Sequence, residues 1–330
     1  MKIGLDAMGG DRAPGVNVEG AIMAVEEYGY NVVLIGKKSL IDKELSGKPY
    51  PKDKIEVIDA SQAIAMDEPA ALSVRKKRDS SIVVGAAFLK EKKYDAFVSA
   101  GNTGAVVCAA TLSLRLLPGV DRPGIAVIFP TLNKPCMVID VGANIDPKPF
   151  HLLQYGIMGD AYSKHIFKTV NPTVGLLNIG EESSKGTDFV REAHTMLSES
   201  ELNFIGNIEP KEVYRGKADI VVCDGFVGNV FLKVTEGFSE AASQLLKREL
   251  KQSNILTKLG ALLTLPAFRA IKKKIDANEY GGAPLMGVDG SVIIAHGSSN
   301  ATAIKNAIRA AAESVAQKVN SHVVEELQNF

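Results

Sequence analysis

Short apolar runs alternate with longer amphipathic segments along most of this chain. Between most of the runs, apolar residues return at steps of three and four, as on one face of a helix, at 18–28, 80–93, 103–117 and 151–167. Such alternation predicts an α/β protein with a largely parallel sheet covered by helices on both faces. The predicted strands lie at about 2–6, 31–35, 54–58, 94–99, 124–129, 136–141, 173–178, 201–206, 218–223 and 291–295.

Two parts of the chain depart from this alternation. Residues 118–135 are rich in proline, which predicts either a crossover between lobes or a local antiparallel excursion of the sheet. Residues 226–280 contain two helical patterns in succession with no strand between them, so we expect a helical hairpin that projects from the sheet. We interpret residues 1–330 as a single α/β catalytic domain that includes this hairpin.

The predicted strands repeatedly end in turns rich in Gly, Asn, Asp and Ser. In an open α/β sheet, such turns lead into helices, and their backbone N–H groups and the positive helix ends can hold an anion. The repetition therefore predicts a phosphate site. The candidate residues in these turns are Gly9, Gly10, Asn102, Thr103, Asp140, Asn144, Lys185, Asp224, Asn229, His296 and Ser298.

Each candidate also has a structural alternative. Asn102 and Thr103 can cap the following helix, and a pure capping role is expected for one of the two. Gly9 can simply permit a tight connection. His296 by itself indicates little, because a solitary histidine is more often structural than catalytic. Lys185 lies between small residues at an expected helix start, which favours a lysine that binds phosphate.

The second helix of the predicted hairpin is both apolar and basic. It is too short and too charged to span a bilayer, but it suits an anionic membrane surface or docking against an acidic protein. The alternative is a dimer interface whose lysines are merely solvated. The candidate contact residues are Leu256, Leu259, Leu262, Leu263, Phe268, Lys272 and Lys273.

Composition and missing motifs narrow the chemistry. Lys plus Arg and Asp plus Glu both total 38, so nothing points to nucleic acid. The N-terminus has no apolar stretch typical of a signal peptide, which predicts a cytoplasmic protein. The three cysteines lie far apart in apolar runs and are expected to be reduced core thiols. No dinucleotide, P-loop, zinc-hydrolase or GxSxG motif is present, so we expect no cofactor, no metal, and a nucleophile supplied by a substrate.

An ordered set of motifs resembles the bacterial phosphate acyltransferase family, phosphate:acyl-[acyl-carrier-protein] acyltransferase. The resemblance runs nearly end to end, and the order of the motifs makes it specific. One departure is Phe150, which stands where an acidic residue is expected in the family. The motifs are DAMGGDRAP at 6–14, SAGNTGA at 99–105, DRPG at 121–124, DVGAN at 140–144, GEESSKG at 180–186, IGNIE at 205–209, DGFVGN at 224–229, YGGAPLMG at 280–287 and HGSSN at 296–300.

The resemblance implies the fold, the reaction and the partners. The fold would be a three-layer α/β/α, Rossmann-like architecture, similar to the isocitrate/isopropylmalate dehydrogenase and phosphotransacetylase group. The reaction would move a long acyl chain from acyl carrier protein to inorganic phosphate, and the acyl phosphate would feed a membrane glycerol-3-phosphate acyltransferase. Homodimerisation and peripheral membrane association are implied as well. Lys185 and Asn229 would form the catalytic pair, Lys185 holding phosphate and Asn229 donating to the oxyanion or fixing the phosphate.

Alternatives from other classes stay open at this point. A phosphotransacetylase-like enzyme would use acyl-coenzyme A in place of the carrier protein. A metal- and NAD-dependent decarboxylating dehydrogenase of similar fold would need carboxylates that converge on a divalent ion, and Asp6, Asp140 and Asp224 could supply them. A non-catalytic scaffold would use only the basic hairpin.

Overall fold

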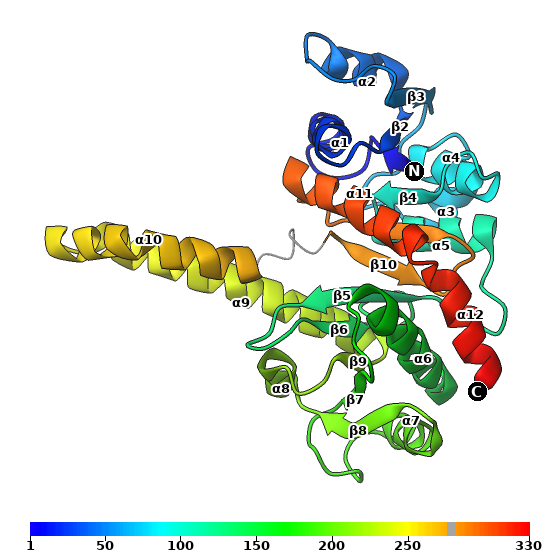
Figure 1. Cartoon of the computed structure of the whole chain (residues 1–330), viewed down its shortest axis with the longest axis vertical. Helices are drawn as coiled ribbons and strands as arrows, with labels where there is room; N and C mark the ends of the chain where they lie inside the picture. Colours follow the sequence, from blue (N-terminus) through cyan, green and yellow to red (C-terminus); the bar gives the residue numbers. More distant parts are fainter. Residues whose placement is uncertain (276–280) are drawn as a thin grey trace.

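The computed structural model describes the backbone of residues 1–275 and 281–330 and the side chains of residues 1–267 and 281–330. Its centre is an 11-stranded sheet (Figure 1). The strands are β1 (Lys2–Asp6), β2 (Asn31–Gly36), β3 (Ile55–Asp59), β4 (Ala96–Ser99), β5 (Gly124–Phe129), β6 (Cys136–Ile139), β7 (Thr173–Leu177), β8 (Asn203–Ile208), β9 (Ile220–Val222), β10 (Ala283–Met286) and β11 (Ser291–Ile294). Their spatial order is β3-β2-β1-β4-β11-β10-β5-β6-β9-β7-β8.

Helices cover both faces of this sheet (Figure 1). In the half of the sheet that contains β1, helices α1 and α11 pack together on one face, and α4 and α5 pack together on the opposite face. In the other half, α6 packs on β6 and β9 and contacts α7 and α12. The helices are α1 (Gly15–Tyr28), α2 (Lys38–Leu45), α3 (Ala70–Lys76), α4 (Ser81–Lys90), α5 (Thr103–Leu114), α6 (Pro149–Ile166), α7 (Asp188–Glu199), α8 (Pro210–Arg215), α9 (Gly225–Gln252), α10 (Ile255–Ile275), α11 (Ala301–Ala316) and α12 (Val319–Asn329).

The apolar runs form strands that are buried on both faces. In β2, Val32 and Leu34 belong to one buried cluster, whereas Val33 and Ile35 belong to another. Successive side chains of a strand point to opposite faces, so a continuous apolar run requires a helix layer on each side. The predicted three-layer α/β architecture is therefore confirmed.

The direction of the strands reverses across the middle of the sheet. Strand β10 pairs antiparallel with both β11 and β5, and β5 pairs antiparallel with β6, whereas the other pairings between described strands are parallel. Three reversals make β6, β9 and β7 run opposite to β1, β4 and β11. The proline-rich segment thus forms the antiparallel excursion that was one of its two predicted forms. Only the short strand β10 separates the end of β11 from the start of β5, because Ala283 pairs with Ile294 and Leu285 pairs with Ile125.

Strand β10 is the one described strand that the sequence pattern missed. It has four residues, Ala283–Met286, and includes Pro284. Proline cannot donate to a sheet ladder, so it argues against a strand when read from sequence. Here Pro284 is paired in register with Ile293 of β11, and the ladder to β5 is made by Leu285 and Met286.

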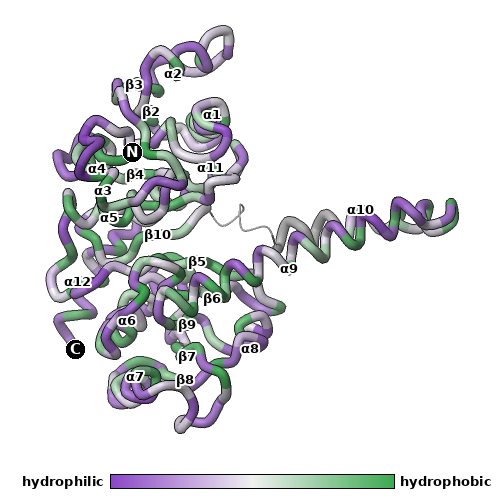
Figure 2. The backbone as a smooth tube through the Cα atoms, turned by 180° about the vertical axis from the view of Figure 1, so that it is seen from behind, coloured by the Kyte–Doolittle hydropathy of each residue, from purple (hydrophilic) through white to green (hydrophobic). Residues whose placement is uncertain are grey.

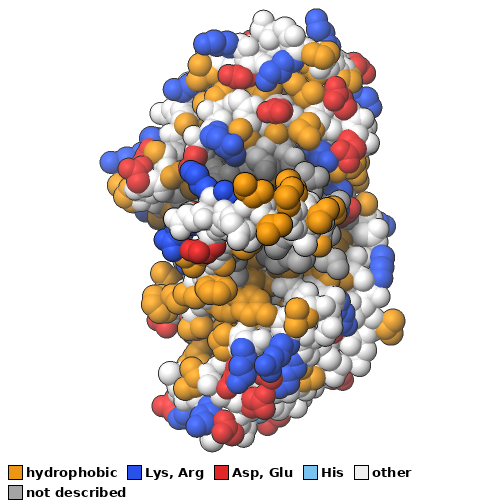
Figure 3. Space-filling model, turned by 90° about the vertical axis from the view of Figure 1, so that its left-hand side faces the viewer, with side chains coloured by type: hydrophobic (Ala, Val, Ile, Leu, Met, Phe, Trp, Pro, Cys, Tyr) orange, Lys and Arg blue, Asp and Glu red, His pale blue; other side chains and the backbone are white. Residues whose placement is uncertain are grey.

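Helices α9 and α10 form the predicted hairpin and project well beyond the sheet (Figure 1). Figure 2 shows apolar and polar residues alternating along both helices to the tip. A view toward the tip shows hydrophobic and basic side chains next to each other (Figure 3). Of the predicted contact residues, Leu256, Leu259, Leu262 and Leu263 are exposed. The side chains of Phe268, Lys272 and Lys273 lie outside the described residues.

Candidate functional site

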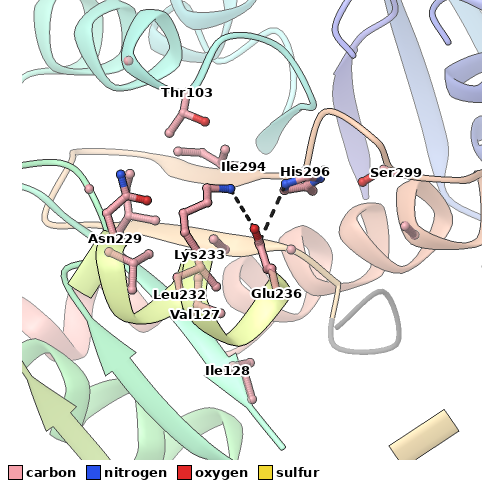
Figure 4. Close-up of a pocket in the computed structure, with 18 residues that line it drawn as sticks. Thr103, Val127, Ile128, Asn229, Leu232, Lys233, Glu236, Ile294, His296 and Ser299 are labelled. Atoms are coloured by element: carbon pink, nitrogen blue, oxygen red, sulfur yellow. Dashed lines mark hydrogen bonds and ion pairs between the residues drawn. The ribbon is translucent and has the colours of Figure 1, made fainter. Parts of the chain in front are cut away.

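A cavity of about 340 Å³ lies where the two oppositely directed parts of the sheet meet (Figure 4). Its apolar walls come mainly from β5, the start of β10 and the end of β11, and its polar side chains come from helix starts and from α9. An apolar cavity with a few polar groups suits an amphipathic ligand. The lining residues are Thr103, Gly104, Ile125, Val127, Ile128, Val141, Gly142, Asn229, Leu232, Lys233, Glu236, Gly282, Ala283, Ile294, Ala295, His296, Ser299 and Ala303.

Asn229 is placed in the cavity by the way α9 begins. Asp224 caps the helix, because its side chain accepts hydrogen bonds from the backbone N–H groups of Phe226 and Val227. At Gly228, a Cβ atom would lie 2.0 Å from the carbonyl oxygen of Asp140, so only glycine lets the helix pack on the turn after β6. Asn229 follows directly and reaches the cavity. Asp224 itself is not a lining residue.

Lys233 and Glu236 are cavity residues that the sequence analysis missed. They follow Asn229 at i+4 and i+7 on α9, and this spacing puts the three side chains on one face of the helix. Lys233 Nζ lies 2.8 Å from Glu236 Oε2. The turn motifs mark residues at the strand ends, and these two residues lie beyond the DGFVGN turn. The signal that could have indicated them is their helical spacing from Asn229.

His296 faces the same helix from across the cavity (Figure 4). Its Nε2 atom is 3.8 Å from Glu236 Oε1. Its Nδ1 atom accepts a hydrogen bond from the backbone N–H of Ser298 at 3.2 Å and lies 2.7 Å from the Ser298 hydroxyl. Nε2 therefore carries the proton of the neutral ring. Ser298 orients His296, and it is Ser299 that lines the cavity.

Asp140 and Asn144 hold the turn after β6 together. Asp140 Oδ1 accepts from the backbone N–H groups of Gly142 and Ala143, and Oδ2 accepts from the backbone N–H and the side-chain amide of Asn144. Burial raises the pKa of the Asp140 carboxyl above its ordinary value, and these hydrogen bonds oppose the rise. The Asn144 amide also donates to the carbonyl of Pro123 and to the hydroxyl of Tyr155. Neither Asp140 nor Asn144 lines the cavity.

The turns after β1, β4 and β11 pack against one another. At Gly9, a Cβ atom would lie 2.5 Å from the backbone nitrogen of Gly101, so the missing side chain permits this contact. At Gly10, a Cβ atom would lie 2.9 Å from the carbonyl oxygen of Gly297. Gly9 and Gly10 thus serve the packing of the turns and do not line the cavity.

Of the two adjacent residues Asn102 and Thr103, one caps helix α5 and the other lines the cavity, as predicted. The side-chain oxygen of Asn102, Oδ1, caps α5 by accepting from the backbone N–H of Ala105. The side-chain NH₂ of Asn102 donates to the backbone carbonyls of Ala65, Met66 and Glu68. Asn102 is therefore occupied by structural hydrogen bonds. Thr103, the first residue of α5, lines the cavity.

Lys185 lies on an exposed loop between β7 and α7. Its side-chain ammonium has no hydrogen bond or ion pair with any other described residue, so it is available to a ligand. Strand β7 pairs with β9, which leads into α9, so the loop of Lys185 begins one strand away from the start of the helix that carries Asn229. Lys185 is not among the residues that line the cavity.

The geometry also bears on the alternative chemistries. Asp6 holds the turn after β1, Asp140 holds the turn after β6 and Asp224 caps α9, so each carboxylate is engaged within its own turn. Within the described part of the chain, no group of three or more His, Cys, Asp or Glu side chains is placed to hold a metal ion. Cys136 and Cys223 are free and buried, as predicted, and burial raises the pKa of the Cys223 thiol well above its ordinary value.

Comparison with known proteins identifies the family. A model described as a fatty acid synthesis protein matches residues 1–322. The phosphate acyltransferase of Dictyoglomus turgidum is 49% identical, with 100% of this chain and 98% of the relative covered. That of Geotalea daltonii is 48% identical, with 99% and 94% covered. The chain belongs to the phosphate acyltransferase family. The enzyme therefore acts in fatty acid synthesis, and the predicted family and phosphate acyltransferase activity are confirmed.

Solved structures of other enzymes share the fold. A phosphotransacetylase from Streptococcus pyogenes has a TM-score of 0.65 at 19% identity. The match covers 96% of this chain and 94% of the phosphotransacetylase chain. A 4-hydroxythreonine-4-phosphate dehydrogenase from Klebsiella pneumoniae has a TM-score of 0.52 at 15% identity, with 96% and 99% covered. These likenesses confirm the predicted fold group. Among the described helices, none is both long enough and apolar enough to cross a membrane.

Proposed function

We propose that this phosphate acyltransferase moves a long fatty acyl group from the thioester of acyl carrier protein to inorganic phosphate, and that the acyl phosphate serves phospholipid synthesis. The observation that carries this proposal is the cavity, in which apolar strand residues lie beside the polar face of α9. Such a cavity can hold the start of an acyl chain on one side and the reacting phosphate on the other. We further propose that residues 1–330, hairpin included, act as one catalytic domain.

The chemistry needs no protein nucleophile. The second ionisation of phosphate lies within about a unit of neutrality, so a phosphate oxygen is already a nucleophile at pH 7. What the enzyme must supply is position and charge stabilisation. Holding phosphate against the thioester carbonyl contributes on the order of 7–11 kcal/mol, and one donor to the developing oxyanion about 3–4 kcal/mol.

We assign these two tasks to Lys185 and Asn229. Asn229 lines the cavity, and its amide makes no hydrogen bond to any other described residue. It can therefore donate to the oxyanion or fix the phosphate. The Lys185 ammonium, on the loop after β7, makes no hydrogen bond or ion pair with any other described residue, and we propose that it holds the phosphate and neutralises its charge. Thr103 and His296 complete the substrate contacts.

The direct test is incubation of the enzyme with long-chain acyl carrier protein thioester and phosphate, with detection of acyl phosphate by mass spectrometry. Formation of acyl phosphate together with free carrier protein supports the proposal. If acyl-coenzyme A is used instead and the carrier-protein thioester is left intact, the donor is coenzyme A and our assignment of the donor is wrong.

We also propose that the hairpin has two contact surfaces. On α9, Val230, Val234 and Phe238 are 48%, 64% and 74% exposed and lie at i, i+4 and i+8, which suits an apolar dimer interface. On α10, Leu259 and Leu263 are 52% and 84% exposed and follow the basic Lys258. This face suits peripheral binding at an anionic membrane surface on the cytoplasmic side, close to the glycerol-3-phosphate acyltransferase that would consume the product.

Leu259→Glu with Leu263→Glu tests the membrane surface. Burying an apolar side chain contributes about 1.5–3 kcal/mol, so the pair of charges should release the enzyme from anionic vesicles while soluble turnover is kept. Vesicle co-sedimentation measures this. The matched control is Val170→Glu, which alters an apolar residue that is 93% exposed and lies in the connection between α6 and β7. Dissociation of a dimer with unchanged vesicle binding would instead make α10 an oligomer interface.

A further inference from the structure

Lys233 and Glu236 form a charged pair that the acyl-transfer scheme above leaves without a role. Both residues line the cavity on the same face of α9 as Asn229 (Figure 4). Lys233 Nζ binds one carboxylate oxygen of Glu236, Oε2, at 2.8 Å. The two side chains are 57% and 38% exposed, and an ion pair as exposed as this contributes little to stability. Stability alone therefore does not account for the pair.

The second carboxylate oxygen of Glu236 is open to a ligand. Oε1 faces the protonated Nε2 of His296 at 3.8 Å, which is too long for a hydrogen bond. It accepts no hydrogen bond from any other described residue. Lys233 thus holds the carboxylate through Oε2, and Oε1, which His296 flanks, remains an open acceptor at the cavity.

A carboxylate in a cavity for phosphate is unfavourable unless a proton lies between the two anions. Phosphate at neutral pH still carries at least one O–H group, because its last proton is lost only at high pH. An ionised carboxylate can accept a hydrogen bond from this O–H group. Sulfate has the same shape and a similar charge, but it carries no proton at neutral pH, so the carboxylate can only repel it. A carboxylate acceptor therefore distinguishes the two ions.

We propose that Lys233 and Glu236 form an oxyanion subsite that selects inorganic phosphate. Lys233 provides the positive charge, and Glu236 Oε1 accepts a hydrogen bond from the phosphate O–H group. His296 flanks Oε1 and remains one of the proposed substrate contacts. The subsite deepens the proposed function and rests on it, because it assumes that phosphate reacts in this cavity. Selectivity arises mainly from repulsion of the wrong ion, since the open oxygen of the Glu236 carboxylate penalises any oxyanion that has no proton to donate.

Steady-state acyl transfer with sulfate and arsenate as competitors tests the subsite. Arsenate keeps an O–H group at neutral pH, so it should compete with phosphate in every variant. In Glu236→Gln, the amide can donate to sulfate, and the Ki for sulfate should fall at least tenfold relative to the KM for phosphate. Lys233→Met should raise the KM for phosphate at least tenfold and leave the KM for the acyl donor unchanged. The controls are Glu240→Gln and Lys247→Met, which change exposed residues farther along α9.

Thermal unfolding in phosphate and in sulfate gives a second measurement that needs no acyl donor. At equal ionic strength, phosphate should raise the Tm of the wild type more than sulfate does, and this difference should disappear in Glu236→Gln but not in Glu240→Gln. An unchanged preference for phosphate in Glu236→Gln in both assays would overturn the proposal, as would a Lys233→Met variant whose defect lies in the KM for the acyl donor. If the wild type forms no acyl phosphate but binds phosphate with this selectivity, the proposed donor fails and the subsite stands.

Discussion

In the turn after β6, both oxygens of Asp140 are occupied by hydrogen bonds from Gly142, Ala143 and Asn144. The side chain of Asn229 on α9, which packs directly on this turn, and the ammonium of Lys185 on the loop between β7 and α7 make no hydrogen bond to any other described residue. Both regions stand out in the sequence as polar turn motifs. The two regions differ in whether their hydrogen-bond donors and acceptors are already bonded to other residues of the protein. A polar group that is already satisfied within the protein cannot bind a substrate without breaking that bond.

The largest expected effect is a loss of turnover when the open polar groups of Lys185 and Asn229 are removed. Lys185→Ala and Asn229→Ala should each lower phosphate-dependent turnover at least about a hundredfold, because each removes a charge or donor positioned for the transition state. The Tm should stay close to that of the wild type, since neither side chain supports the fold. Steady-state kinetics and thermal unfolding measure the two quantities. Lys52→Ala, at an exposed loop lysine before β3, is the matched control.

Near-normal turnover in both variants would contradict this site assignment. A drop in turnover in Lys185→Ala alone would keep the phosphate contact on the loop after β7 and would remove Asn229 from the catalytic pair.

The next effect concerns stability. Asp140→Asn puts an amide NH₂ where a carboxylate oxygen accepts at least two hydrogen bonds, so it should lower the free energy of unfolding by about 2–4 kcal/mol. Asp6→Asn is the matched comparison. Its Oδ2 accepts from the Ser99 hydroxyl, which can rotate and accept from an amide, so the loss should be only about 1 kcal/mol. Urea denaturation measures both, and equal losses would refute this account of the two turns.

Asn102 and Thr103 are adjacent but should respond differently. Asn102→Ala removes a helix cap and leaves three carbonyls without their donor, so we expect a loss of about 1–2 kcal/mol in unfolding free energy. Thr103→Val keeps the shape of the side chain and should leave stability within about 0.5 kcal/mol while it weakens turnover a few-fold. If Asn102→Ala instead lost turnover at full stability, Asn102 would belong with the substrate contacts.

The smallest expected effect is that of a chelator. Because phosphate brings an ionised oxygen to the reaction, EDTA should leave the rate of acyl phosphate formation unchanged. The rate should be compared before and after dialysis against EDTA, with Mg²⁺ and Mn²⁺ added back to separate samples. Loss of turnover that a divalent ion restores would show that the enzyme requires a metal.

The residues of the site were only partly predictable from sequence. Asn229, Thr103 and His296 were expected at the site and line the cavity, whereas Asn144 and Gly9 share the same motif signal and serve the turns. Motif signals mark positions where glycine and short polar residues are needed, and they do not separate a need of the fold from a need of the ligand.

The sequence by itself determined the layers, the hairpin and the family. The alternation of Val32 to Ile35 and the helical spacing along α9 are local patterns, and burial on two faces or one face follows from them directly. Only the tertiary structure decided which polar groups stay open. Asn102 is satisfied by carbonyls more than 30 residues earlier, and Glu236 meets a histidine 60 residues later. Contacts between segments so far apart depend on how the strands are arranged in the sheet. That arrangement includes the reversal of direction at β10, a short strand with a proline that the sequence pattern does not predict.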